Sequence, residues 1–240
     1  MAAKHTDLII TIPTQRDLPL LNQPARHGPS EGHKMAWLGH IQVLQYFVDS
    51  FPEGSTGLII EDDADWDIHI HEAVPRIQQA VRGLTHTGSK AEVKEAAEMP
   101  YGLSWDVLWL GHCGDSFPFT PMIHFDDDTV PPRSRIKTWN KDLLSLPDGT
   151  RTVHYSVGPE CTVAYAVTSS TAKKLLAYPM DTEHSVFNWV WLVELNYAAL
   201  QSIPRSFITK KHMVKSAPAR SMWSIVARWT DSIALLWGSQ

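Results

Sequence analysis

The segment GLIIEDDADWD, residues 57–67, joins a short apolar run to a dense group of acidic residues. The uninterrupted apolar run at 57–60 is typical of a central β-strand that other elements cover on both faces. The acidic group that follows it consists of Glu61, Asp62, Asp63, Asp65 and Asp67. Because these carboxylates repel one another, we expect the fold to bring a positive charge to them.

Strands and helices are predicted to alternate along most of the chain. Short apolar runs predict further strands over residues 7–12, 105–110, 152–157 and 162–167. Helical spacing predicts helices over residues 33–50, 70–84, 90–98, 169–178 and 183–195, with Ser169 or Ser170 as the cap of the fourth. Residues 112–150, rich in proline and acidic residues, are interpreted as a long loop. This order predicts an α/β fold, a mostly parallel sheet flanked by helices, in a single domain over residues 1–240.

Ligands of such sheets bind beyond the carboxyl ends of the strands. Glu61 directly follows the strand at 57–60, and His112 follows the strand at 105–110, so we expect both at one cleft. If residues 61–67 remain extended, side chains alternate along them. Glu61, Asp63, Asp65 and Asp67 then share one side, and Asp62 points to the other.

Carboxylate oxygens are ligands that suit Mg²⁺ or Mn²⁺, and a cation held by one or two of them keeps positions open for a diphosphate. The sequence therefore predicts a metal site at Asp63, Glu61 and Asp65, with a solvated acidic loop as the alternative. A calcium EF-hand loop is excluded because Ile68 and Val74 stand where it needs Gly and Glu. A phosphohydrolase with its nucleophile directly after the strand remains an alternative.

Composition limits the partners and the setting of the chain. A net charge of -5 leaves no basic surface, so we expect no nucleic-acid partner. No stretch approaches the ~20 apolar residues of a transmembrane segment, and the start lacks the pattern of a signal peptide, which predicts a cytoplasmic protein. The two cysteines, Cys113 and Cys161, are expected to be buried thiols, although they could pair. His69 and His71 are interpreted as surface residues at the start of a helix.

Several segments together resemble glycosyltransferase family 25, which includes lipooligosaccharide sugar transferases and collagen galactosyltransferases. The resemblance covers roughly residues 35–182. It is carried by LIIEDDADWD (58–67), WDVLWLGHCG (105–114), CTVAYAVTSSTAKKLL (161–176), WLGHIQVLQYF (37–47) and YPMDTE (178–183). In the fourth segment, Gly39-His40 stands in the place of a Ser-His pair.

The resemblance implies a GT-A-like sheet, a nucleoside-diphosphate sugar donor, a glycan or protein acceptor, and Mn²⁺ (or Mg²⁺). Glu61, Asp62 and Asp63 would form the DxD-like element, with Asp63 as the principal metal ligand. Asp62, His112 and His40 would contact substrate. If the reaction inverts the anomeric centre, a carboxylate must take the proton of the acceptor hydroxyl, and Asp181 and Glu160 are the candidates. By analogy with the family, the Golgi or the secretory pathway is an alternative location.

Two parts of the chain depart from the family. Few residues separate Asp17 from Trp37, where family members carry a further strand and helix. Asn188 stands where the family tends to have an acidic residue, and residues 205–240 are divergent. Residues 221–240 are amphipathic, which predicts a helix packed on the core. The shortened region motivates an alternative, a non-catalytic family member that binds sugar or metal.

Overall fold

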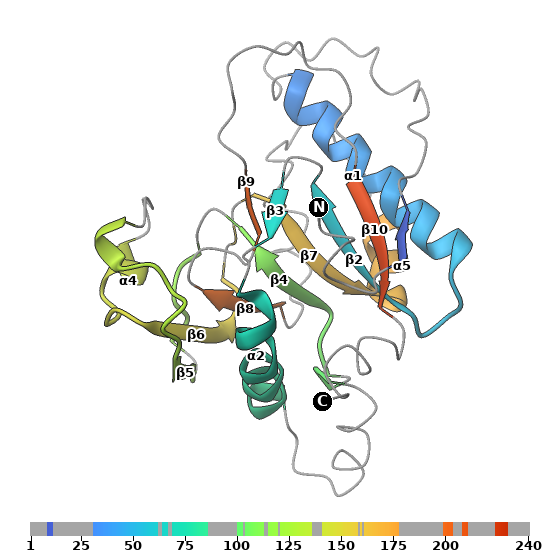
Figure 1. The fold of residues 1–240 in the computed structure, drawn as a ribbon. Helices are drawn as coiled ribbons and strands as arrows, with labels where there is room; N and C mark the ends of the chain where they lie inside the picture. Colours follow the sequence, from blue (N-terminus) through green and yellow to red (C-terminus); the bar gives the residue numbers. More distant parts are fainter. Residues whose placement is uncertain are drawn as a thin grey trace, which may run out of the picture.

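The computed structural model describes residues 9–11, 31–61, 64–66, 69–85, 100–102, 104–112, 115–119, 121–135, 141–157, 159, 161–177, 199–203, 208–210 and 224–229. The strands are β1 (Ile9–Thr11), β2 (Thr56–Glu61), β3 (Ala64–Trp66), β4 (Val107–Gly111), β5 (Ile123–Asp126), β6 (Thr150–Tyr155), β7 (Ala164–Thr168), β8 (Ala199–Ile203), β9 (Ile208–Lys210) and β10 (Ser224–Trp229). The helices are α1 (Glu31–Ser50), α2 (Ile70–Thr85), the short α4 (Lys141–Leu144), α5 (Ser169–Ala177) and the 3-10 turn η3 (Arg133–Arg135). Figure 1 shows their arrangement.

The fold is mixed α/β, but the predicted mostly parallel sheet is wrong. The main sheet has the order β1-β10-β2-β7-β4-β8-β6-β5, and β3 pairs with β9 in a second, small sheet. Within the main sheet only β4 and β8 pair in parallel, and every other neighbouring pair is antiparallel. Apolar runs indicate strands but not their direction, so the antiparallel pairing could not be predicted from them. Because β2 and β4 both pair antiparallel with β7, they run in the same direction.

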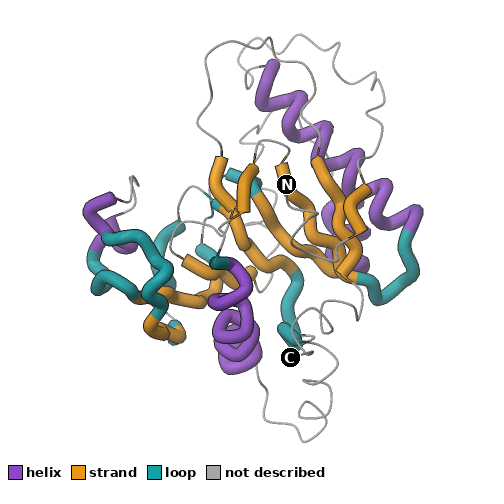
Figure 2. The backbone as a smooth tube through the Cα atoms, in the orientation of Figure 1, coloured by secondary structure: helices purple, strands orange, loops and turns teal. Residues whose placement is uncertain are grey.

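Helices cover both faces of the centre of the sheet (Figures 1 and 2). On one face α1 and α5 pack over a cluster that includes Phe47, Ile59 and Trp109. On the other face α2 packs over a cluster that includes Leu58 and Ile60. Side chains of β2 therefore alternate between two buried layers. This confirms the interpretation of residues 57–60 as a strand covered on both faces.

Two local features position helices on this face of the sheet, one at Gly57 under α1 and one at the start of α5. A Cβ placed on Gly57 would lie 3.1 Å from the ring of Phe47, so the missing side chain lets α1 lie close against β2. At the start of α5, the backbone N–H of Thr171 donates to Thr168 Oγ1 (3.2 Å), and Thr171 Oγ1 donates to Asp106 Oδ1 (2.7 Å). The capping residue is therefore Thr168, one position before the expected serine pair.

Two predicted segments differ in the structure. The predicted loop at 112–150 contains β5, η3 and α4, and β5 forms a hairpin with β6. The predicted amphipathic helix at 221–240 is wrong for residues 224–229, which form β10 between β1 and β2. Backbone hydrogen bonds to a strand on each side hold this segment in the extended form, whatever the helical spacing of its apolar residues. The helices predicted at 90–98 and 183–195 lie outside the described residues.

Candidate functional site

The end of β2 and the end of β4 lie at the same edge of the sheet, on either side of β7. Ile60 and Gly111 both pair with Ala164, each from its own side. Glu61 and His112 come next along the chain. Since neighbouring strands are about 4.8 Å apart, their backbones lie about 10 Å from each other. The structure thus brings the two predicted segments together at one edge.

Glu61 is held at this edge through both its backbone and its side chain. Its backbone N–H donates to the carbonyl of Val163 (3.0 Å), which continues the β2–β7 ladder by one residue. Its Oε1 accepts a hydrogen bond from Thr162 Oγ1 (2.9 Å). The residue is only 5% exposed, so the carboxylate is turned into the protein beneath α1. A buried carboxylate of this kind is tolerated only where hydrogen bonds satisfy it.

His40 of α1 lies behind this carboxylate and is 1% exposed. Its Nε2 is 2.8 Å from Thr162 Oγ1 and 3.8 Å from Glu61 Oε1, and its Nδ1 is 3.3 Å from the hydroxyl of Tyr165. The single hydroxyl proton of Thr162 goes to Glu61, so Nε2–H of His40 must donate to Thr162. We call these four residues, Tyr165, His40, Thr162 and Glu61, the buried relay.

Tyr165 completes the buried relay from the middle of the sheet. Burial raises the pKa of the Tyr165 phenol well above its usual range, and the nearby charge of Glu61 raises it further. The phenol therefore keeps its proton at neutral pH, and its hydroxyl lies within hydrogen-bond distance of His40 Nδ1. The ring also packs against Trp109, with centroids 5.5 Å apart. The relay is thus embedded in the apolar layer beneath α1 rather than in solvent.

The remaining predicted site residues are described only in part. Asp65 lies in β3, opposite Thr209 of β9, so the backbone of this part of the acidic segment is extended. Its side chain, together with Asp62, Asp63, Glu160 and Asp181, lies outside the described residues. Among the residues that are described, no group of three His, Cys, Asp or Glu is placed to hold a metal ion. Of the three predicted metal ligands, only Glu61 has a described side chain, and its Oε1 accepts the hydrogen bond from Thr162.

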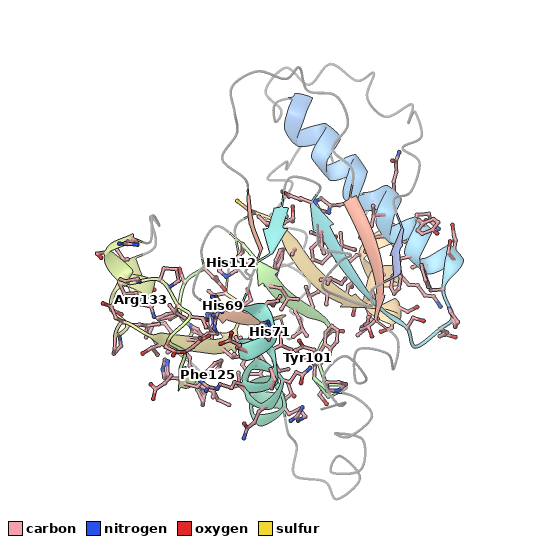
Figure 3. The ribbon with its side chains drawn as sticks, viewed as in Figure 1. His69, His71, Tyr101, His112, Phe125 and Arg133 are labelled. Carbon is pink, nitrogen blue, oxygen red and sulfur yellow. The ribbon has the colours of Figure 1, made fainter. Side chains whose placement is uncertain are left out.

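Three histidines in this part of the chain are labelled in Figure 3, one after β4 and two at the start of α2. His112 follows β4, and both of its ring nitrogens are shielded from solvent. His69 and His71 are 47% and 65% exposed in their side chains, and both approach Glu72, at 2.9 and 3.7 Å. The interpretation of His69 and His71 as surface residues at a helix start is confirmed. His112 is the one of the three that lies next to the strand end.

A second buried carboxylate lies in the segment that follows His112. Asp115 is 2% exposed and accepts hydrogen bonds from Ser156 Oγ (3.0 Å), from the backbone N–H of Val157 (3.2 Å) and from that of Ser116 (2.8 Å). Burial lowers the pKa of neighbouring His154, an effect that the charge of Asp115 opposes. These bonds tie the segment after β4 to the end of β6, which gives Asp115 a structural role.

No sequence pattern predicted a role for Thr162 or Tyr165 at the site, because both fit an ordinary strand. The expectation of two buried thiols is wrong, because Cys161 is disulfide-bonded. The chain contains one other cysteine, Cys113. Cys161 also has a φ of 66°, the left-handed region that residues other than glycine seldom adopt.

No protein-family model, curated protein or solved structure matches the chain. Within the described part of the chain, none of the helices has the length and apolar character needed to cross a membrane.

Proposed function

We propose that the chain is a metal-dependent glycosyltransferase, which transfers a sugar from a nucleoside-diphosphate sugar to a glycan or protein. The proposal rests on one observation. The acidic segment 61–67 begins at the end of β2, and His112 follows the end of β4 at the same edge of the sheet, with only β7 between the two strands. The resemblance to family 25 over residues 35–182 gives the reaction class. The net charge of -5 does not favour a nucleic-acid partner.

The predicted site residues have different roles in this proposal. Asp63 and Asp65 would hold Mn²⁺ (or Mg²⁺), which when bound neutralises the charge that grows on the departing diphosphate. Glu61, turned under α1, fixes the start of the segment. His112 would contact the phosphates or the acceptor. Asp181 or Glu160 would take the proton from the acceptor hydroxyl as the new bond forms.

The burial of Glu61 bears on the alternatives. A phosphohydrolase of the aspartyl-phosphate kind would use the first residue after the strand as its nucleophile. Here that residue is Glu61, which is 5% exposed and hydrogen-bonded to Thr162, so it is poorly placed to attack a substrate. A non-catalytic family member stays a second candidate because the chain is short between Asp17 and Trp37. Only turnover distinguishes it from the enzyme.

The disulfide bears on the location. Disulfides persist in oxidising compartments and are rare in the cytosol. The bond at Cys161 therefore favours the secretory pathway over the cytoplasm.

Calorimetry with a panel of nucleoside-diphosphate sugars, with and without Mn²⁺, tests the proposal. We expect one donor to bind only with Mn²⁺ and Asp63→Ala to abolish that binding. Asp128→Ala is the matched control, because it removes an exposed carboxylate from the other acidic group of the chain. Absence of donor binding in the wild type would refute the proposal. Donor binding without hydrolysis or transfer would identify the non-catalytic member, and phosphate release from a generic ester would identify a phosphohydrolase.

A further inference from the structure

We propose that Thr162 is a positioning residue whose hydroxyl, backed by His40, sets the orientation of the Glu61 side chain and so holds the end of β2 from which the acidic segment continues. The consequence for cation binding rests on the proposed function, whereas the consequence for local order does not. The role predicted for His40 changes with it, from substrate contact to support of Thr162.

Two consecutive residues before β7 hold Glu61 at two points. The carbonyl of Val163 accepts from its backbone N–H at 3.0 Å, and the hydroxyl of Thr162 donates to its side chain at 2.9 Å. The backbone bond fixes where the strand passes, and the side-chain bond orients the carboxylate. Since Glu61 is the last residue of β2, loss of the side-chain bond is expected to loosen the end of the strand.

Within the buried relay, only the hydroxyl of Thr162 lies within hydrogen-bond distance of both His40 and Glu61. It accepts from His40 Nε2 and donates to Glu61 Oε1, whereas His40 and Glu61 are themselves 3.8 Å apart, too far for a direct hydrogen bond. Thr162 is therefore the link through which α1 and β2 are connected at this point. Without the hydroxyl, the carboxylate loses a partner in a buried setting. Rotation toward water then becomes favourable.

His40 is already committed to this role on both sides of its ring. Nε2 faces Thr162 at 2.8 Å, Nδ1 faces the hydroxyl of Tyr165 at 3.3 Å, and the residue is 1% exposed. Neither ring nitrogen is left to bind a sugar or a phosphate. The relay thus joins α1 to β2 and β7, and it does so from the side of the sheet opposite α2.

A set of threonine variants of the full chain tests this role. Thr162→Val keeps the shape and removes the hydroxyl, and Thr162→Ser keeps the hydroxyl. Thr171→Val is the matched control: Thr171 is also buried (0% exposed, against 5% for Thr162), also donates to a carboxylate, that of Asp106, and lies just beyond the other end of β7, in α5. Two quantities are measured: amide hydrogen exchange of the segment 61–66, and Mn²⁺ affinity by calorimetry.

We expect Thr162→Val to speed exchange in 61–66 about tenfold and to weaken Mn²⁺ binding about tenfold, in line with the loss of a partner that orients a metal-site residue. Thr162→Ser should stay near the wild type in both. Thr171→Val should lower the melting temperature without changing either quantity. A merely structural role for Thr162 would make the two valine variants alike.

Equal exchange of 61–66 in Thr162→Val and Thr171→Val would overturn the inference, whether or not Mn²⁺ binds. If the wild type binds no Mn²⁺, the proposed function fails, and the exchange data still decide the role of Thr162. If Thr162→Val does not fold, Tyr165→Phe replaces it, because it removes only the outer bond to His40. That variant should speed exchange of 61–66 about threefold, and unchanged exchange would overturn the inference.

Discussion

The ion pair between Asp127 and Arg151 offers the sharpest test of how the outer strands of the sheet are held. Arg151 Nε donates to Asp127 Oδ2 at 2.5 Å, and the two residues are 1% and 3% exposed, respectively. The other carboxylate oxygen accepts from the N–H and the hydroxyl of Thr129, at 3.0 and 2.6 Å. The pair lies just beyond β5 and joins it to β6.

The structure sets the expected magnitude. Removing one member of a buried pair leaves the other charge uncompensated, which costs about 3–5 kcal/mol. We therefore expect Asp127→Asn and Arg151→Met each to lower the free energy of unfolding by about that amount. The second change adds little once the first is made, because no buried charge is then left unpaired. The double variant should thus lose about as much as one single variant, rather than the sum of both.

Equilibrium urea unfolding of the wild type, the two single variants and the double variant measures this coupling. The pair formed by Lys173 and Glu53 is the control: its atoms are 2.8 Å apart, but the side chains are 47% and 84% exposed, so its double-mutant cycle should show no measurable coupling. Additive losses at Asp127 and Arg151 would refute the reasoning. So would a coupling no larger than that of the exposed pair.

The ion pair between Asp127 and Arg151 also predicts how the stability of the protein changes at acidic pH. Burial raises the pKa of Asp127, but hydrogen bonds from Thr129 and the charge of Arg151 outweigh it and hold the pKa below its usual range. The unfolded chain therefore takes up this proton first, at about pH 4. The stabilisation is complete above that pH and is lost as the pH falls through the lower folded-state pKa. Asp127→Asn should flatten the loss of stability below about pH 4, measured by urea unfolding.

Further predictions concern other parts of the sheet. Burial lowers the pKa of His154, so as the pH falls the unfolded state binds this proton before the folded state does. The free energy of unfolding should therefore decrease below about pH 6.5, down to the lower folded-state pKa. The melting temperatures at pH 7 and pH 5 should differ less in His154→Gln than in the wild type. Reducing the disulfide at Cys161, which closes a loop of about 50 residues, should cost up to about 4 kcal/mol, and Cys161→Ser should melt at one temperature with or without reductant. Gly57→Ala should cost about 1–3 kcal/mol in urea unfolding because its methyl group meets the ring of Phe47, whereas an unchanged midpoint would show that α1 yields freely.

Local patterns predicted most of the helices and strands that the structure describes. The spacing that predicted a helix over 33–50 corresponds to α1, Glu31–Ser50, and the one over 70–84 corresponds to α2, Ile70–Thr85. Val74, Ile77 and Val81 face the core as their spacing requires. These features depend on residues three or four positions apart, so the sequence contains them directly.

The arrangement of the strands was decided by contacts between distant segments. β10 comes from residues 224–229 and yet lies between β1 and β2, and β7 runs against both of its neighbours. A period of two residues is the same for either strand direction, so no local pattern distinguished them. The hairpin of β5 and β6 was missed for a related reason: β5 is four residues long and lies among prolines.

The sequence by itself determined where acidic residues follow a buried strand, and that His112 follows a second strand, because both facts are local. Only the tertiary structure decided that Glu61 turns inward to Thr162, 101 positions away along the chain, and that Thr162 also meets His40, 122 positions away. Hydrogen bonds of a few ångströms between such distant residues exist only once the β2–β7 register is set. That register depends on the packing of the whole sheet.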